Sequence, residues 1–251
     1  MGRITSGHKG SLNSMSEHFE AARIGHVEAH RLDGFIDAAF AFAVSVMVIA
    51  GTEVPHSVDG LLLALDRIPG FACSFATLMI FWHRHVRWRD RFRLHDAATI
   101  RMSLMLVFFA LIFVYPLDFL FQAMFSSLYE GYTHVALPNE PVISSVHGLK
   151  AIFICYAAAY ACMAGCLALL YRHSLRKSPA LSPAQRIEAS ETYYVQCGSI
   201  GVAVLSMLAA LLIPNSQNPW LDSLPGMVYA LLTVVYRVAG NWSRRASAQL
   251  T

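Results

Sequence analysis

Six apolar segments, each close to the length of a bilayer-crossing helix, constrain the fold of this chain more than any other feature. A helix needs about 20 apolar residues to cross the hydrocarbon core of a membrane. The segments cover approximately residues 34–51, 68–86, 100–121, 146–171, 193–213 and 221–239. Only 14% of the residues are charged, whereas soluble domains carry about 25%. The sequence therefore predicts an all-α membrane protein with six transmembrane helices.

The basic residues lie almost entirely on one side of these six segments. Seventeen of the nineteen Lys and Arg residues fall in the N-terminal region, the second and fourth connections, and the C-terminal end. Only Arg67 and Lys150 fall on the opposite side. Because the cytoplasmic loops of membrane proteins are enriched in Lys and Arg, this distribution predicts an even number of spans, with both termini in the cytoplasm.

The sequence divides into three predicted parts. Residues 1–30 are polar and lack the apolar core of a signal peptide. We expect an N-terminal tail there, disordered over 1–15 and forming a short surface helix over 16–30. Residues 31–240 form the predicted transmembrane domain, and 241–251 form a short C-terminal tail. Within the domain, the apolar run at 61–65 predicts either an extra turn or an interfacial helix that leads into the second span.

The sequence carries no sign of enzymatic or nucleic-acid function. No connection between the apolar segments is long enough to hold a soluble active site, and no P-loop, GxSxG, HExxH or dinucleotide fingerprint occurs. His83, His85 and His95 resemble the histidine boxes of membrane desaturases only weakly, because there is one HxH and no second box. The net charge of +3 is too small to indicate a nucleic-acid partner. We therefore expect no catalysis, no cofactor and no resident metal.

One carboxylate, Asp37, lies within the first apolar segment. A charge at such a depth is costly unless it is paired or serves a function. On a helix, Phe42, Ser45 and Ile49 form one stripe, and Asp37 points about 140° away from Phe42. Two interpretations follow from this spacing. Asp37 pairs with an Arg or His of another helix, or it is itself an ion or proton site.

The third apolar segment contains Pro116 and Asp118. Proline inside a helix removes a backbone hydrogen bond and produces a kink. We expect Asp118 to lie near the outer end of this span, where water reaches its carboxylate.

Short motifs in the first three segments resemble those of the transmembrane protein 175 family. In chain order they are Arg31-x-x-x-Phe35-x-Asp37, Ser74-Phe75 with Phe81-Trp82-x-x-His85, and Phe113-Val114-Tyr115-Pro116. The first resembles the RxxxFSD signature of the family, and the others resemble its second-span and third-span patterns. The resemblance covers about residues 31–120, in the order that the family shows.

The resemblance implies a potassium-permeable cation channel with modest selectivity, a class found in lysosomes and prokaryotic membranes. It also implies a homotetramer with six spans per subunit, in which the first helices line a central pore. Phe42, Ser45 and Ile49 then face the axis, and Phe42 forms a hydrophobic constriction. The residues implied to brace this helix are Arg31, Phe35, Asp37, Trp82 and His85. We expect the plasma (inner) membrane as the location, with monovalent cations as the permeant partners.

Four positions depart from the family pattern, and they keep other hypotheses open. They are Ile36 in place of the motif Ser, Phe42 in place of an aliphatic residue, Arg84 in place of Asn, and Val86 in place of a second His. The main alternative is a proton-conducting pathway or H⁺-coupled transporter that uses Asp37 and His85. A membrane enzyme with histidines at the inner edge and a non-conducting homologue are two further alternatives.

Overall fold

The computed structural model of the chain describes residues 31–49, 56–134, 143, 145–178, 181–214 and 219–249, and these form helices and connections but no strand. The predicted tail at 1–30 lies outside the described residues. Four described helices are long and apolar enough to cross a membrane: Arg31–Ile49, Ala97–Thr133 (α4), Val146–Lys177 (α5) and Pro183–Leu212 (α6). A fifth span results if Val58–Asp66 (α2) and Ile68–Phe92 (α3) count as one bent helix. The chain is an integral, all-helical membrane protein.

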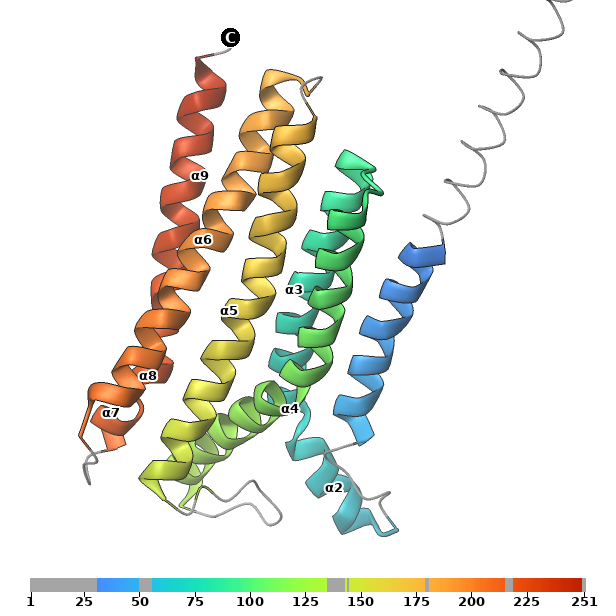
Figure 1. Cartoon of the computed structure of the whole chain (residues 1–251). Helices are drawn as coiled ribbons and strands as arrows, with labels where there is room; N and C mark the ends of the chain where they lie inside the picture. Colours follow the sequence, from blue (N-terminus) through green and yellow to red (C-terminus); the bar gives the residue numbers. More distant parts are fainter. Residues whose placement is uncertain are drawn as a thin grey trace, which may run out of the picture.

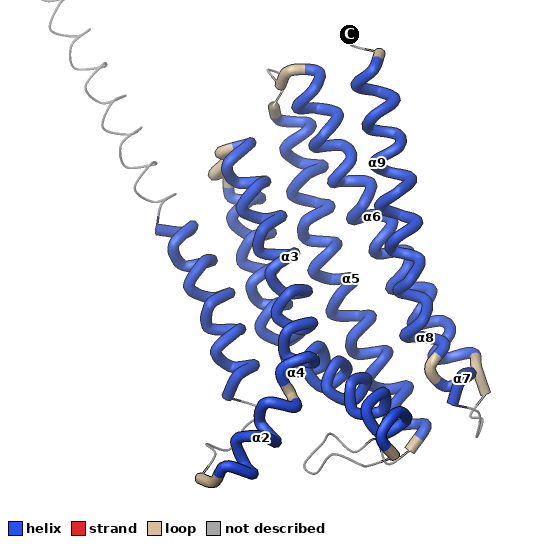
Figure 2. The backbone as a smooth tube through the Cα atoms, turned by 180° about the vertical axis from the view of Figure 1, so that it is seen from behind, coloured by secondary structure: helices blue, strands red, loops and turns tan. Residues whose placement is uncertain are grey.

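The long helices stand side by side in one bundle (Figure 1). The N-terminal helix, Arg31–Ile49, lies at one edge beside α3 and α4. At the opposite edge, α9 (Leu232–Ala248) lies beside α6. The view from behind shows the same order (Figure 2). The helices α5 and α6 therefore lie in the middle of the bundle, whereas the N-terminal helix is peripheral.

The apolar run at 61–65 lies in the helix α2, which confirms that it is helical, whereas its interfacial position stays a prediction. Its first turn is capped by Ser57, whose Oγ accepts a hydrogen bond from the backbone N–H of Gly60 at 3.0 Å. A new helix, α3, begins directly after Arg67 and carries Pro69 in its first turn. Proline is tolerated there but not in a helix interior, and the two helices meet at a bend of 43°.

The helix α4 is longer than the predicted third span and continues through Pro116. Both views show it bending, so that its last part leans toward the start of α5 (Figures 1 and 2). Asp118 is only 9% exposed and accepts a hydrogen bond from Gln122 Nε2 at 3.4 Å. A Cβ added to Gly70 of α3 would lie 2.7 Å from Gln122 Oε1. The expectation that water reaches Asp118 is therefore wrong, because α4 continues to Thr133 and holds this carboxylate against α3.

The predicted sixth span is divided into short pieces. They are Pro219–Asp222 (α7), Leu224–Met227 (α8), the 3-10 turn Val228–Leu231 (η1), and α9. Pro219 and Pro225 each stand in the first turn of a new piece, where the missing N–H of proline is tolerated. Ser206 Oγ of α6 donates a hydrogen bond to the carbonyl oxygen of Pro225 at 2.8 Å. Within the described ranges no single piece is long and apolar enough to span, and α9 crosses the predicted domain end at residue 240.

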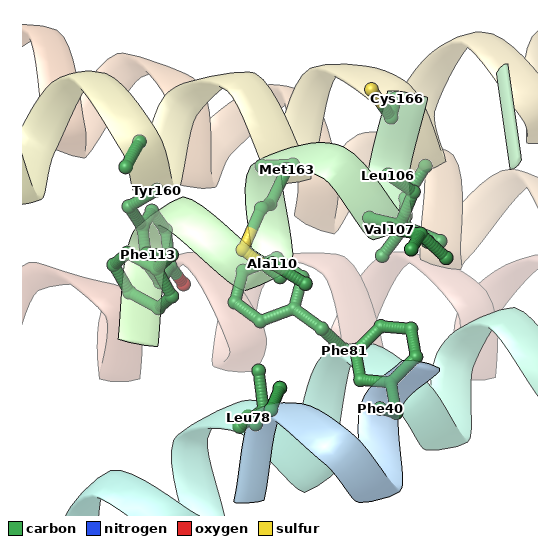
Figure 3. Packing of buried hydrophobic residues seen from close by; sticks show 14 of the residues in the cluster. Phe40, Leu78, Phe81, Leu106, Val107, Ala110, Phe113, Tyr160, Met163 and Cys166 are labelled. Atoms are coloured by element: carbon green, nitrogen blue, oxygen red, sulfur yellow. The ribbon is translucent and has the colours of Figure 1, made fainter. Parts of the chain in front are cut away.

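The core of the bundle is formed by α3, α4 and α5, with a contribution from the N-terminal helix (Figure 3). The rings of Phe81, Phe113 and Tyr160 lie with their centroids between 5.2 and 6.3 Å apart. Their interplanar angles are large, which is a favourable edge-to-face arrangement. Phe40 of the N-terminal helix is 2% exposed and belongs to the same cluster. This packing determines which face of the N-terminal helix points inward.

Ion pairs join the helices at the predicted cytoplasmic end. Asp96, in the connection from α3 to α4, lies 2.9 Å from His173 Nε2 and 3.1 Å from Lys177 Nζ of α5. Partial burial opposes the ionisation of Asp96, but hydrogen bonds from Lys177, His173 and Thr99 lower the pKa of its carboxyl to about 2. Two further pairs, which join α3 to α6, are Arg87–Glu188 and Arg91–Glu188.

Candidate functional site

The N-terminal helix buries one narrow face against its own subunit. The side chains on this face are Ile36, Phe40, Ala43 and Met47, each at most 2% exposed. Their spacings of four, three and four residues match one side of an α-helix. The helix therefore docks through a single stripe, which leaves most of its circumference outside the core.

The opposite side of this helix is exposed and largely apolar. Phe42 is 61% exposed, Ile49 is 74% exposed, and Ser45 is exposed between them. The Oγ of Ser45 donates a hydrogen bond to the carbonyl oxygen of Ala41 at 3.1 Å. The three residues expected to form a stripe thus lie on one uncovered face, which we call the outer face of the N-terminal helix.

Asp37 lies between the two faces and is held by α3. Its Oδ1 accepts a hydrogen bond from Trp82 Nε1 at 2.9 Å. Its Oδ2 lies 3.4 Å from Arg89 Nη1, and the same nitrogen lies 3.7 Å from a carboxylate oxygen of Asp33. We call Asp37, Trp82 and Arg89 the Asp37 anchor. Because a charged hydrogen bond requires a defined geometry, the anchor fixes the rotation of the N-terminal helix about its axis.

His85 connects α3 to α4 inside the subunit. Its Nε2 lies 3.0 Å from Ser103 Oγ, and only 1% of the residue is exposed. The imidazole packs beside the indole of Trp88, with a centroid distance of 5.5 Å. Trp88 Nε1 in turn donates a hydrogen bond to Ser174 Oγ of α5 at 2.8 Å. His85 and Trp88 thus hold α3 in the position from which Trp82 and Arg89 reach Asp37.

Arg31 and Phe35 are both exposed at the start of the N-terminal helix. In the described part of the chain, neither contributes a hydrogen bond or ion pair to the Asp37 anchor. Arg89 was not among the residues expected to hold the N-terminal helix, because the sequence placed it only among the cytoplasmic basic residues. Spacing offered a signal, because Arg89 follows Trp82 by seven residues and Asp33 precedes Asp37 by four. Such intervals place side chains on one helix face.

Among the described residues, no group of three or more His, Cys, Asp and Glu side chains is arranged to hold a metal ion. The arrangement instead offers a peripheral helix with an uncovered apolar face and a charged anchor on its inner side.

Comparisons with known proteins bear on this region. Residues 31–116 match the sequence profile of the family described as Endosomal/lysosomal potassium channel TMEM175. A protein of Marivirga tractuosa named Potassium channel is 23% identical over 222 residues, which cover 86% of this chain and 89% of that protein. The fold is similar to that of a variant of the potassium channel MtTMEM175, solved in complex with a Nanobody-MBP fusion protein. That match has a TM-score of 0.71 at 23% identity and covers 86% of this chain and 93% of the other.

The matched profile covers the N-terminal helix, α2, α3 and the first part of α4. This region carries the three motifs recognised in the sequence and all of the Asp37 anchor. The profile match, the curated relative and the fold agree, and together they show that the chain is similar to the TMEM175 family.

Proposed function

We propose that this chain is one subunit of a potassium-permeable cation channel of modest selectivity, built as a homotetramer with six spans per subunit in the plasma (inner) membrane. The N-terminal helices of four subunits line the central pore, and Phe42, Ser45 and Ile49 face its axis. The observation that carries this proposal is the uncovered outer face of a helix at the edge of the bundle, opposite its buried stripe.

A pore needs several copies of the chain, because one helix cannot enclose a channel. On the outer face, Phe42 is 61% exposed and Ile49 is 74% exposed. By contrast, more than half of the residues in the apolar stretch of α5 are buried. Closed rotational symmetry is the usual arrangement of identical subunits. Small residues, Ala38 and Ala41, flank the stripe and permit close approach of helices from neighbouring subunits. The potassium-channel names of the relatives support potassium as the permeant ion.

The outer face has the chemistry of a cation pathway. A ring of four Phe42 side chains would narrow the pore with apolar surface, and such constrictions gate by excluding water. Aromatic faces also attract cations. Ser45 lies one turn further along, and its hydroxyl oxygen keeps lone pairs for an ion while its proton is donated to Ala41. Dehydration at Phe42 and oxygen contacts at Ser45 would together give permeation with modest discrimination among monovalent cations.

Ion flux from proteoliposomes tests the proposal. Flux should be carried by potassium at least as fast as by sodium, should rise in Phe42→Ala, and should be lost in Phe42→Trp. Phe108→Ala is the matched control, because Phe108 is a similarly exposed phenylalanine, at 54%, but lies on α4 and not on the N-terminal helix. Equal flux in the wild type, Phe42→Ala and Phe108→Ala would place the constriction elsewhere.

The alternative, a proton pathway through Asp37 and His85, is tested by the same preparation. Asp37 is engaged by Trp82 and Arg89, and His85 is engaged by Ser103. A proton carrier predicts that Asp37→Asn abolishes flux driven by a pH gradient. The channel predicts that Asp37→Asn lowers the yield of assembled protein, because it weakens the anchor, while the assembled fraction still conducts potassium.

A further inference from the structure

A groove runs between α6 and α9, at the edge of the bundle that lies opposite the N-terminal helix (Figure 1). Its volume is about 660 Å³, which is in the range of small-molecule sites. The lining from α6 includes Tyr194, Gly198, Gly201 and Leu205, and the lining from α9 includes Val234, Val238 and Trp242. Most of these residues are exposed, so the groove is open along one side. We call it the α6–α9 groove.

Two glycines of α6 shape the α6–α9 groove. A Cβ added to Gly198 would lie 2.5 Å from Val235 Cγ1 of α9, so the two helices approach closely there. A Cβ added to Gly201, about one turn further along, would have no atom within 4 Å. Gly198 thus permits the contact of α6 with α9, whereas Gly201 leaves a space that no side chain of the described residues fills. Because membrane helices are surrounded by lipid, an open apolar space of this kind is filled by lipid.

The length of the α6–α9 groove matches one leaflet of a bilayer. The groove extends from Tyr194 to Leu205 along α6 and from Leu231 to Trp242 in the last segment. Each interval corresponds to roughly 16 Å of helix, and half of a hydrocarbon core is about 15 Å thick. The rings of Trp242 and Tyr194 lie edge-to-face with centroids 5.3 Å apart, at the end predicted to be cytoplasmic. Because Trp and Tyr concentrate at membrane–water interfaces, this aromatic pair marks the level of the lipid headgroups.

Beyond the aromatic pair, α9 is basic. It carries Arg237, Arg244 and Arg245 and no acidic residue. Arg245 follows Trp242 by three residues and Val238 by seven, which places it on the side of α9 that lines the groove. It forms no ion pair with any residue that the structure describes. A positive charge therefore borders the cytoplasmic mouth of the α6–α9 groove.

One carboxylate, Glu191 of α6, lies near this end of the groove. A Cβ added to Gly240 would lie 3.7 Å from Glu191 Oε1. Gly240 and Trp242 point about 200° apart around α9, so Glu191 and Trp242 lie on different sides of that helix. The other carboxylate in this part of α6, Glu188, is paired with arginines of α3. The charge at the mouth of the groove is therefore mainly positive, which suits an anionic headgroup.

We propose that each subunit binds one anionic phospholipid of the cytoplasmic leaflet, with an acyl chain in the α6–α9 groove and the headgroup phosphate beside Arg245. The planar guanidinium group is well suited to hydrogen bonds with phosphate oxygens. The inference rests on the proposed function, because a pore lined by the N-terminal helices leaves the opposite edge of each subunit, with α9, facing lipid.

Native mass spectrometry of the purified full-length protein in detergent tests the proposal. Phosphatidylglycerol and phosphatidylcholine with identical acyl chains are added separately. The wild type should retain one phosphatidylglycerol per subunit and bind it about tenfold more tightly than phosphatidylcholine. Gly201→Leu should weaken the binding of both lipids about tenfold, because its side chain occupies the path of the acyl chain. Gly165→Leu of α5 is the matched control, because a Cβ there also meets open space, and it should leave binding unchanged.

Arg245→Gln tests the headgroup contact. It should weaken the binding of phosphatidylglycerol about fivefold and leave that of phosphatidylcholine unchanged. Arg101→Gln removes an exposed arginine of α4, so it controls for the change in net charge and should bind both lipids as the wild type does. Equal binding of the two lipids by the wild type, or unchanged phosphatidylglycerol binding in either Gly201→Leu or Arg245→Gln, overturns the proposal.

The same spectra give the mass of the assembly, which separates failure of this proposal from failure of the proposed function. A smaller assembly in Gly201→Leu would mean that the groove is a contact between subunits, and it would overturn the lipid site alone. A wild-type assembly that retains the lipid but conducts no potassium in proteoliposomes would contradict the channel and support the lipid site.

Discussion

The N-terminal helix and α5 have similar apolar character but very different surroundings. In the most apolar stretch of each helix, 22% of the residues of the N-terminal helix are buried, compared with 56% of the residues of α5. The α5 helix lies in the middle of the bundle, and α3, α4 and α6 all contact it. The N-terminal helix lies at the edge and touches the core through one stripe. Hydropathy predicts that both enter the membrane but does not show which one the subunit leaves uncovered.

Apolar side chains therefore have two different roles in these helices: some fill the core, and others lie on an exposed face. Side chains of α5 such as Leu167 and Met163 are fully buried and fill the core. Figure 3 shows Met163 within this cluster. On the N-terminal helix, Phe40 has the same role, but Phe42 two residues later is exposed. A helix with an uncovered apolar face is suited to contacts outside its own subunit. The Asp37 anchor then matters more, because few other contacts hold this helix.

The largest expected effect is the difference in the free energy of unfolding between the Phe40→Ala and Phe42→Ala variants. Phe40→Ala should lower the free energy of unfolding by about 3–5 kcal/mol, because it leaves a cavity in the shared core. Phe42→Ala should change it by less than about 0.5 kcal/mol, because its ring contacts little of the subunit. Chemical unfolding of both variants in detergent measures the pair. Equal destabilisation by the two substitutions would mean that the N-terminal helix has no distinct inner and outer face.

A smaller effect tests the anchor. A double-mutant cycle with Asp37→Asn and Arg89→Gln should give a coupling of about 1 kcal/mol, because Asp37 is 41% exposed and its charge is partly screened. Unfolding of the two single variants and the double variant measures this coupling. Asp90→Asn removes a neighbouring, 70% exposed carboxylate and should couple to Arg89 far more weakly. Additive effects of Asp37→Asn and Arg89→Gln would show that the helix is held by packing alone.

The smallest effect concerns the cytoplasmic end, in the region around α5. The pKa of Asp96 is lowered to about 2 from its model-compound value of 3.8 by hydrogen bonds from Lys177, His173 and Thr99. Its contribution to stability is therefore complete above about pH 4 and is lost as the pH falls toward 2. We expect it to be below about 1 kcal/mol.

Tm measured between pH 5 and pH 2 checks this contribution. The wild type should lose more Tm than Asp96→Asn over this interval, because only the wild type must protonate the carboxylate. Parallel decline in both proteins would show that Asp96 does not contribute to the acid sensitivity of the fold.

Several features of the fold could be predicted because they depend on local patterns. The apolar runs predicted the long helices, and the run at 61–65 predicted α2. Asp118 was predicted wrongly, because its burial depends on Gln122 of its own helix and on the close approach of Gly70 of α3. The pieces of the last segment were missed because mean hydropathy over residues 221–239 does not register the single Pro225 within them. The family was recognised from motifs, whereas the functions of Phe42, Ser45 and Ile49 remain predictions.

The sequence by itself determined that the chain enters a membrane, that it is helical, and that it resembles one channel family. These follow from hydropathy, from the obligation to satisfy backbone hydrogen bonds in lipid, and from short motifs. Only the tertiary structure decided that Asp37 meets Trp82 and Arg89, that Phe40 is buried while Phe42 is exposed, and that Arg84 packs against the ring of Tyr236 on α9. The reason is physical: the partner of a side chain depends on how helices distant in sequence pack, and hydropathy does not encode that packing.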